Sequence, residues 1–184
     1  MPFRFRRLAL PELLLIEPKR YPDARGWFME QFKRTEFAAA GIVDTFVQDN
    51  VSYSVRGVLR GLHYQAAPSA QAKLVTTLEG EVFDVAVDVR PDSDRYGQWT
   101  GVWLRADRGT ALYIPTGFAH GFLVTSHEAL VLYKCSAEYN PECERGIRWD
   151  DPVIAIRWPI SDPIVSEKDR QFRPLGTTPR EAKT

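Results

Sequence analysis

The sequence predicts a mainly β protein, a sandwich or barrel of short strands with few helices. Eight short segments are rich in apolar, β-branched or aromatic residues, and turn-forming clusters separate them. Helical periodicity, in contrast, is scarce along the 184 residues. A jelly roll is among the few folds of this class that hold a ligand between two sheets, so we expect a jelly roll.

The first predicted element is a short helix in the stretch Arg34–Gly41, with Thr35 as its candidate cap and Gly41 as its candidate end. From there on the pattern favours strands. In chain order they are Thr45–Val51, Gly57–Gln65, Lys73–Leu78, Glu81–Val89, Thr100–Leu104, Ala111–Ile114, Gly121–Val124 and Leu130–Cys135.

The clearest of these strands is Glu81–Val89, because its residues alternate regularly. One face is apolar, and the other carries two carboxylates, Asp84 and Asp88. After the last strand, the proline-rich stretch Trp149–Leu175 predicts an irregular wrap with one helical turn near Ser166–Gln171.

Composition limits the class of protein. The chain has 24 lysines and arginines against 24 aspartates and glutamates, so it lacks the broad positive field that nucleic acid binding requires. Its length and its 44% hydrophobic residues suit one domain spanning residues 1–184. Zero net charge together with five Trp, seven Tyr and ten Phe points to self-association.

The sequence also bears on location. No apolar run is long enough to cross a membrane, and Pro11 and Glu12 interrupt the apolar stretch that follows the basic N-terminus. We therefore expect a soluble protein with no signal peptide and no membrane contact. Cys135 and Cys143 cannot form a disulfide framework, which fits reduced thiols in the cytoplasm.

Polar residues fall on strand faces that should belong to the core. By alternation, Gln48 and Asn50 share one face of their strand, His63 and Gln65 share a face of theirs, and Lys73 opens the next strand. Each residue alone is more often a solvated surface residue, but several together predict a polar pocket, because buried polar groups need partners.

Arg60 belongs to the same set of polar residues, but its position conflicts with that of His63. The two residues are three apart, so strict alternation places them on opposite faces of the strand. A bulge at Gly61 would bring both to one pocket. The sequence leaves this question open.

The segment Pro115-x-Gly117-x-x-His120 resembles the second motif of the cupin superfamily, in which the histidine binds a metal. The first cupin motif needs His-x-His, whereas this chain has His63-Tyr64-Gln65. The third histidine of the chain, His127, falls in a predicted loop. We therefore expect no metal.

Tyr133 is either a general acid or a half-buried core tyrosine.

Taken together, seven phrases resemble the dTDP-4-dehydrorhamnose 3,5-epimerase family, from about Leu14 to Asp169. They are Asp23-Ala-Arg-Gly-Trp-Phe-Met-Glu30, Phe46-Val-Gln-Asp-Asn50, Val58-Leu-Arg-Gly-Leu-His-Tyr-Gln65, Gly80-Glu-Val-Phe-Asp-Val-Ala-Val-Asp88, Ile114-Pro-Thr-Gly-Phe-Ala-His-Gly-Phe122, Tyr133-Lys-Cys135 and Ser166-Glu-Lys-Asp169. The resemblance implies a cupin-type jelly roll that needs no cofactor. It also implies a homodimer that exchanges the N-terminal region of about residues 1–32, and a C-terminal wrap over about residues 149–184.

The resemblance implies a role for each site residue. His63 is the general base, Asp169 its dyad partner, Tyr133 the general acid, and Lys73 the group beside the 4-oxygen of the sugar. The implied substrate contacts are Arg60 and the neighbouring subunit's Arg25 at the diphosphate, Gln48 and Asn50 at the nucleotide-diphosphate part, Glu30, His120, Glu144 and Lys168 along the site, and Phe28 and Tyr139 at the thymine. Interface packing is an almost equal alternative for Phe28 and Tyr139.

The implied reaction inverts carbons 3 and 5 of dTDP-4-dehydro-6-deoxy-D-glucose, a dTDP-4-keto-6-deoxyhexose, to give dTDP-4-dehydro-L-rhamnose. Three alternatives stay open: an epimerase of one carbon acting on a related sugar in an antibiotic-sugar pathway, a metal-dependent cupin, and a sugar-nucleotide binder without catalysis.

Overall fold

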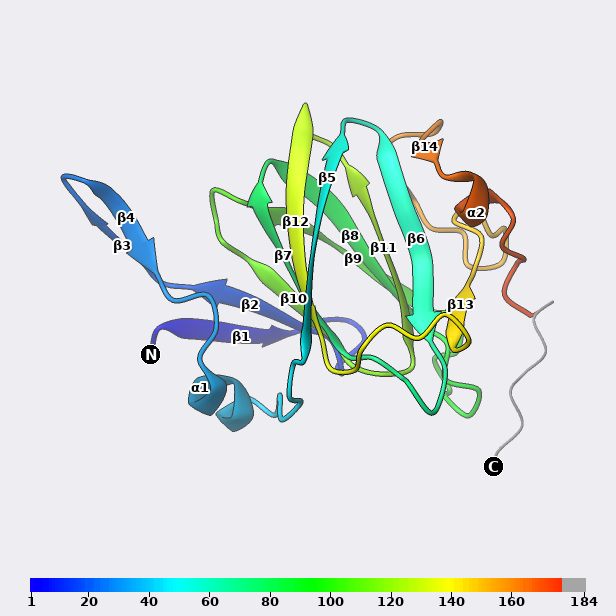
Figure 1. The fold of residues 1–184 in the computed structure, drawn as a ribbon, viewed down its shortest axis with the longest axis horizontal. Coiled ribbons are helices and arrows are strands. Elements are labelled where there is room, and N and C mark those ends of the chain that lie inside the picture. The colour runs from blue at the N-terminus through cyan, green and yellow to red at the C-terminus, as the bar shows by residue number, and fades with distance from the viewer. Residues whose placement is uncertain (177–184) are drawn as a thin grey trace.

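Two antiparallel sheets stacked face to face form the body of the protein in a computed structural model, which describes residues 1–176 (Figure 1). The strand order is β1-β2-β10-β7-β12-β5 in the first sheet and β13-β6-β11-β8-β9 in the second, where the short strand β14 also pairs with β6, in parallel. The strands are β1 (Phe3–Arg7), β2 (Leu14–Pro18), β3 (Arg20–Asp23), β4 (Gly26–Met29), β5 (Gln48–Val55), β6 (Val58–Gln65), β7 (Lys73–Glu79), β8 (Glu81–Asp88), β9 (Trp99–Arg105), β10 (Ala111–Ile114), β11 (Phe118–Val124), β12 (Glu128–Cys135), β13 (Glu144–Gly146) and β14 (Ile164–Val165). The prediction of a mainly β fold with few helices is confirmed.

The main core lies between the sheets. Val75 and Val131 of the first sheet pack with Val82 and Phe122 of the second, and all four are almost fully buried. These residues come from the inward positions of their strands, so the alternation of each strand selects its buried face. The core positions the sheets on which the polar pocket is built.

A second cluster covers part of the outer face of the first sheet. Helix α1 (Arg34–Ala39) buries Phe37 there, and Gly41, at φ +94°, ends the helix as predicted. The amides of Gly41 and Ile42 bond the carbonyls of Ala38 and Phe37, which satisfies the last turn.

The prediction that Thr35 caps this helix is wrong. Lys33 occupies the capping position with extended backbone and makes no side-chain cap bond, and Thr35 lies inside the first turn. The helix forms because Phe37 packs into the second cluster, and this burial outweighs the missing cap.

Six of the eight predicted strands match to within two residues at each end. The strand predicted at Thr45–Val51 is β5, which runs later because its pairing with β12 begins at Gln48 opposite Cys135 and ends at Val55 opposite Glu128. The strand predicted at Gly121–Val124 is β11, which begins earlier, at Phe118.

The chain leaves the body at both ends of the sequence. The hairpin of β3 and β4 projects away from the sheets, and we call it the arm (Figure 1). Beyond β13 the chain runs over the outer face of the second sheet, where Ile154 and Trp158 pack against Val85 and Val87. The expected helical turn is present as α2 (Glu167–Arg170). The expected wrap extends to residue 184, but residues 177–184 lie outside the described residues. Neither helix of the described part is long and apolar enough to cross a membrane.

Candidate active site

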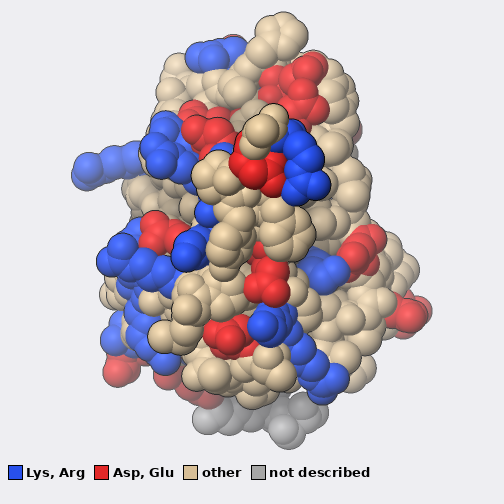
Figure 2. Space-filling model, turned by 90° about the vertical axis from the view of Figure 1, so that its left-hand side faces the viewer, with Lys and Arg blue, Asp and Glu red and all other residues tan. Residues whose placement is uncertain are grey.

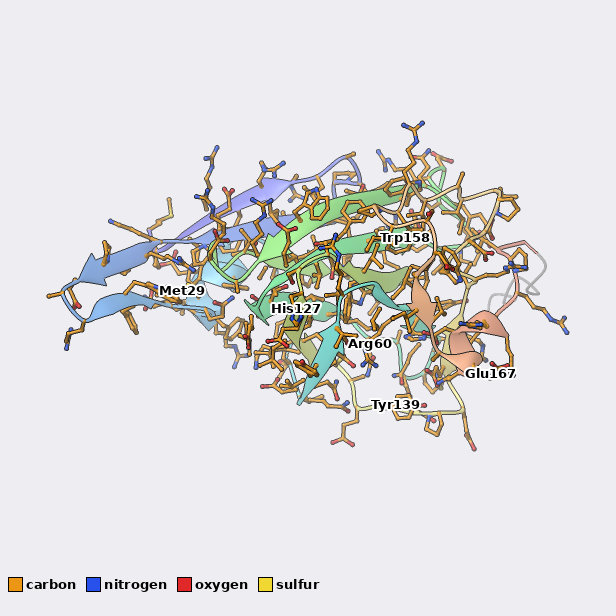
Figure 3. The ribbon with its side chains drawn as sticks, turned by 90° about the horizontal axis from the view of Figure 1, so that it is seen from above. Met29, Arg60, His127, Tyr139, Trp158 and Glu167 are labelled. Atoms are coloured by element: carbon orange, nitrogen blue, oxygen red, sulfur yellow. The ribbon has the colours of Figure 1, made fainter. Side chains whose placement is uncertain are left out.

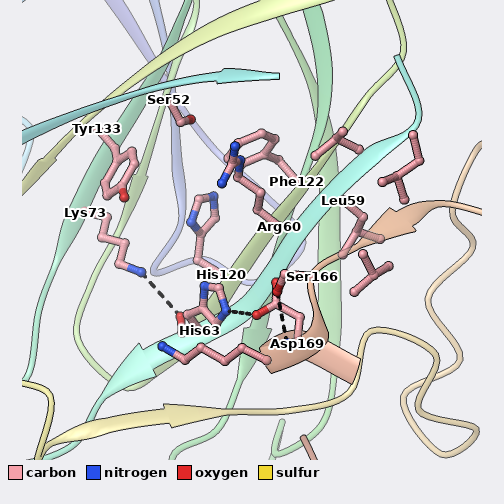
Figure 4. Close-up of a pocket in the computed structure, with 14 residues that line it drawn as sticks. Ser52, Leu59, Arg60, His63, Lys73, His120, Phe122, Tyr133, Ser166 and Asp169 are labelled. Atoms are coloured by element: carbon pink, nitrogen blue, oxygen red, sulfur yellow. Dashed lines mark hydrogen bonds and ion pairs between the residues drawn. The ribbon is translucent and has the colours of Figure 1, made fainter. Parts of the chain in front are cut away.

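A cavity of about 450 Å³ opens between the sheets and is lined by residues of β5, β6, β7, β11, β12, β14 and α2. A smaller cavity of about 270 Å³ adjoins it on the side of β13. His63, Lys73 and Tyr133 border both cavities, so they lie at the junction. Figure 4 shows Lys73 and Tyr133 entering from the first sheet and facing His63, Arg60 and His120 of the second.

A bulge in β6 brings Arg60 and His63 to the same pocket. In the ladder with β11, His63 pairs with His120 and Arg60 pairs with Phe122, so two residues of β6 oppose one residue of β11. Gly61 occupies the bulge at φ +127°, and a Cβ atom there would lie 2.6 Å from the Cα of the facing strand. Only glycine fits this conformation and this close approach.

His63 is paired with a buried carboxylate. Its Nε2 lies 2.7 Å from Oδ1 of Asp169, and Oδ2 of Asp169 accepts the Gly61 amide at 3.1 Å. Asp169 sits in α2, whose first residues are fixed by Ser166, since the Ser166 hydroxyl accepts the Asp169 amide. Burial raises the pKa of Asp169, but the hydrogen bonds with His63 and Gly61 outweigh it and hold that pKa below its ordinary value.

Lys73 and Tyr133 lie on the opposite side of the junction, and burial shifts the pKa of each. Lys73 is 8% exposed, and its Nζ donates to the His63 carbonyl at 3.3 Å. Burial lowers the pKa of Lys73, and the charges of Cys135, Asp84 and Glu144 offset only part of this effect. Burial likewise raises the pKa of the Tyr133 phenol, so Tyr133 holds its proton more firmly than a free tyrosine does.

The smaller cavity is lined by a hydrogen-bonded polar chain. Gln48 donates to Asn50 at 3.0 Å and accepts the Tyr139 amide at 2.8 Å. The Tyr139 hydroxyl donates to Glu144 at 2.6 Å, and the Lys168 ammonium binds the same carboxylate at 2.6 Å. Burial raises the pKa of Glu144, but these two hydrogen bonds outweigh it and lower the pKa overall.

Arg60 lines the larger cavity and not the smaller one. Its guanidinium donates to the Ser54 hydroxyl at 2.9 Å and to the Tyr53 carbonyl at 3.2 Å. The polar residues predicted to converge are therefore divided between the two cavities: Arg60 lies in one, Gln48 and Asn50 lie in the other, and His63 and Lys73 lie between them.

Three predicted site residues lie in or next to the arm and line neither cavity of this chain. Arg25 is paired with Asp23 at 2.7 Å, the Phe28 ring is 66% exposed, and Glu30 is 3.9 Å from Lys33. Figure 3 shows Met29 of the arm well separated from Arg60 and Tyr139. Figure 2 looks onto the side that carries the arm, where acidic and basic side chains are interspersed and basic ones gather along its left-hand margin.

The structure adds two residues that sequence reasoning did not select. Asp84 is fully buried, and its two oxygens lie 3.1 and 2.9 Å from Nε2 of His120. Ser52 lines the larger cavity, and its buried hydroxyl has no partner among the described residues. The available signals were the carboxylate face of β8 and the alternation that places Ser52 in register with Gln48 and Asn50. No three His, Cys, Asp or Glu side chains gather as metal ligands anywhere in residues 1–176.

The fold and the site define a jelly-roll protein with acid–base and cationic groups facing each other across a pocket between its sheets. The sequence profile of the dTDP-4-dehydrorhamnose 3,5-epimerase family matches residues 7–176. The chain is 52% identical to a dTDP-4-dehydrorhamnose 3,5-epimerase of Methanothermobacter thermautotrophicus over 180 residues, which covers 96% of this chain and 97% of that protein. This chain belongs to the dTDP-4-dehydrorhamnose 3,5-epimerase family.

Solved structures agree with this assignment. The crystal structure of dTDP-6-deoxy-D-glucose-3,5-epimerase from Legionella pneumophila, in complex with dTDP-4-keto-L-rhamnose, has a TM-score of 0.91 and 47% identity, covering 94% of this chain and 93% of that one. The 3'-monoepimerase ChmJ of Streptomyces bikiniensis, in complex with dTDP-quinovose, has a TM-score of 0.87 and 35% identity, covering 93% and 87%. The cupin-type jelly roll predicted from the resemblance is thereby confirmed.

Proposed function

We propose that this protein inverts carbons 3 and 5 of dTDP-4-dehydro-6-deoxy-D-glucose to give dTDP-4-dehydro-L-rhamnose. Its strong similarity to a 3,5-epimerase crystallised with dTDP-4-keto-L-rhamnose supports this substrate class. The arrangement at the junction carries the proposal. There the pair of His63 and Asp169 lies on the side of the second sheet, opposite Lys73 and Tyr133 of the first sheet.

In this proposal His63 removes the proton from the carbon next to the 4-keto group. Asp169 occupies Nε2 of the ring, so Nδ1 is the nitrogen left to take the proton. The Asp169 carboxylate then stabilises the imidazolium that forms.

The electrons left on the carbon delocalise into an enolate, and negative charge develops on oxygen 4. The Lys73 ammonium stabilises that oxygen. Tyr133 faces His63 across the junction and delivers a proton to the opposite side of the ring, which inverts the carbon. The direction of the shift fits this role, because burial raises the pKa of Tyr133 and so favours the protonated phenol.

The proposal assigns the remaining residues to binding the substrate, with Gln48 and Asn50 at its nucleotide-diphosphate part. The wall beside the junction is formed by Gln48, Asn50, Tyr139, Glu144 and Lys168. Tyr139, which is 52% exposed, stacks on the thymine. Arg60 and His120 contact the substrate from the larger cavity, and the Arg60 guanidinium suits phosphate oxygens.

We propose a single domain over residues 1–184 that works as a homodimer, with the N-terminal region of about residues 1–32 exchanged and a C-terminal wrap over about residues 149–184. The arm exposes Trp27 and Phe28, and the outward face of β5 exposes Val51 and Tyr53, each by more than half. Such apolar surface favours an interface. Arg25, Phe28 and Glu30 of the partner subunit then complete each site.

The dimer is tested by sedimentation and activity together. The double substitution Val51→Glu and Tyr53→Glu is expected to give monomers that turn over substrate at least tenfold more slowly, because each pocket lacks the partner's arm. The substitution Val153→Glu is the control, since Val153 is 80% exposed in the C-terminal wrap, away from β5. Fully active monomers would contradict the exchange.

The two free, buried cysteines, Cys135 and Cys143, support a location in the cytoplasm.

A coupled assay tests the activity. We expect NADPH oxidation by a 4-keto reductase, supplied with dTDP-4-dehydro-6-deoxy-D-glucose, to depend on this protein and to be lost in the His63→Ala variant. Turnover without the protein, or full turnover by the variant, would refute the proposal. The similarity to a 3'-monoepimerase favours one second candidate, inversion of a single carbon, which product analysis by NMR distinguishes.

A further inference from the structure

The two histidines of the pocket form a matched pair with different surroundings. His63 and His120 are opposite each other in the ladder of β6 and β11, and each has Nε2 bonded to a buried aspartate. The His63 side chain is 31% exposed, and the His120 side chain is 7% exposed. His63 is thus open to a reacting atom, whereas His120 forms part of the wall.

The partner of His120 is a carboxylate whose side chain forms hydrogen bonds to no other residue of the described chain. Asp84 lies on the inward face of β8 between Val82 and Ala86, which belong to the apolar core between the sheets. A carboxylate there is costly unless it is bonded, and the imidazole N–H of His120 is the donor that both of its oxygens meet. Asp88, on the same face four residues later, is bonded instead to Arg90 and Ser93, away from the pocket.

The bond to Asp84 fixes what His120 presents to a ligand. With the proton held on Nε2, the ring cannot turn without leaving a buried charge unpaired. The other nitrogen, Nδ1, forms no hydrogen bond with any residue of the described chain. His120 lines the larger cavity beside Arg60 and Phe122.

We propose that Asp84 is a positioning residue that holds the proton of His120 on Nε2, so that Nδ1 accepts a hydrogen bond from a ring hydroxyl of the nucleotide-linked sugar. This inference rests on the proposed function and adds a division of labour to it. Lys73 donates to the oxygen where charge develops, and His120 accepts from a hydroxyl of the same ring. The hexose ring is then held by a hydrogen-bond donor, Lys73, on one side and an acceptor, His120, on the other. This arrangement fixes which carbon faces His63.

NMR of the intact protein labelled with ¹⁵N at histidine tests the arrangement. His120 is expected to carry a proton on Nε2 and none on Nδ1. The Nδ1 resonance should shift when dTDP-rhamnose is added and stay in place when dTDP alone is added. A protonated Nδ1, or an equal shift with both ligands, would overturn the proposal.

Matched variants separate positioning from simple loss of stability. Asp84→Asn presents an amide donor as well as an acceptor to Nε2, so we expect it to lose the single Nε2–H form of His120. We expect kcat/KM to fall by tenfold or more. Asp88→Asn, an equally buried aspartate on the same strand, should keep both the His120 signals and kcat/KM within about twofold.

Two outcomes keep the two proposals distinct. If Asp84→Asn keeps the wild-type His120 signals and turnover, the role of Asp84 is refuted while the epimerase activity stands. If the wild-type protein shows the sugar-specific shift at Nδ1 but no turnover, the epimerase proposal fails while the role of Asp84 in sugar binding stands. The measurement on the wild-type protein applies even if the Asp84 variant does not fold.

Discussion

Replacing Asp169 with asparagine probes the pair on which proton removal depends. The carboxylate uses both oxygens: Oδ1 meets Nε2 of His63 at 2.7 Å and Oδ2 accepts the Gly61 amide at 3.1 Å. Asparagine keeps the shape but has one carbonyl oxygen, so either His63 or Gly61 loses its acceptor. The side chain is 5% exposed, so water does not readily replace the lost bond.

The expected size follows from the bond that is lost. A hydrogen bond to a charged group contributes about 1.5–3 kcal/mol, and each 1.4 kcal/mol is about tenfold in rate. Asp169→Asn should therefore lower kcat/KM by about 10- to 150-fold in the coupled reductase assay. Glu167→Gln is the control, since Glu167 is exposed on the same helix and its side chain bonds only Gln171 among the described residues. Wild-type kcat/KM in Asp169→Asn would refute the assigned dyad.

Three further predictions follow from the junction and the bulge. Tyr133→Phe should abolish inversion but retain some hydrogen exchange with solvent, measured by mass spectrometry, because His63 still removes the proton. Loss of both exchange and inversion would count against Tyr133 as an acid that acts separately from the base His63. Because burial lowers the pKa of Lys73, kcat/KM should fall as pH rises through a value below the ordinary lysine pKa of about 10.4. That alkaline limb should vanish in Lys73→Arg, and an unchanged limb would exclude Lys73 as its source. Gly61→Ala should lower the free energy of unfolding, measured in urea, by about 2 kcal/mol more than Gly57→Ala does. Gly57 is the control because it also has a positive φ but has open space around its Cβ position. Equal losses would mean that the close approach at the bulge is unimportant.

The limits of sequence reasoning are clearest in β5. Its inward positions are polar, Asn50, Ser52 and Ser54, because they face the pocket, and its outward positions Val51 and Tyr53 are apolar and exposed. This pattern is the reverse of that in an ordinary half-buried strand, so alternation could not locate the strand's end. The apolar Phe46 extended the prediction too early, because it packs on the cluster around α1 and not in the sheet.

Other elements depended on long-range contacts. The face shared by Arg60 and His63 was left open by alternation, since a bulge is set by the close approach of β11 to Gly61 and not by local propensity. The arm has no core of its own, so its strands carried no recognisable period. β8, whose regular alternation was the clearest in the sequence, was predicted to within one residue at each end.

The central claim is proton exchange at two carbons of one bound sugar, and deuterium incorporation tests it most directly. The protein is incubated with dTDP-4-dehydro-6-deoxy-D-glucose in D₂O, the product is trapped by the reductase, and mass spectrometry locates the label. The account predicts deuterium at both carbon 3 and carbon 5, and none in the His63→Ala variant. Product with label at only one of these carbons would identify an epimerase of a single carbon, and the absence of label at both would contradict the mechanism.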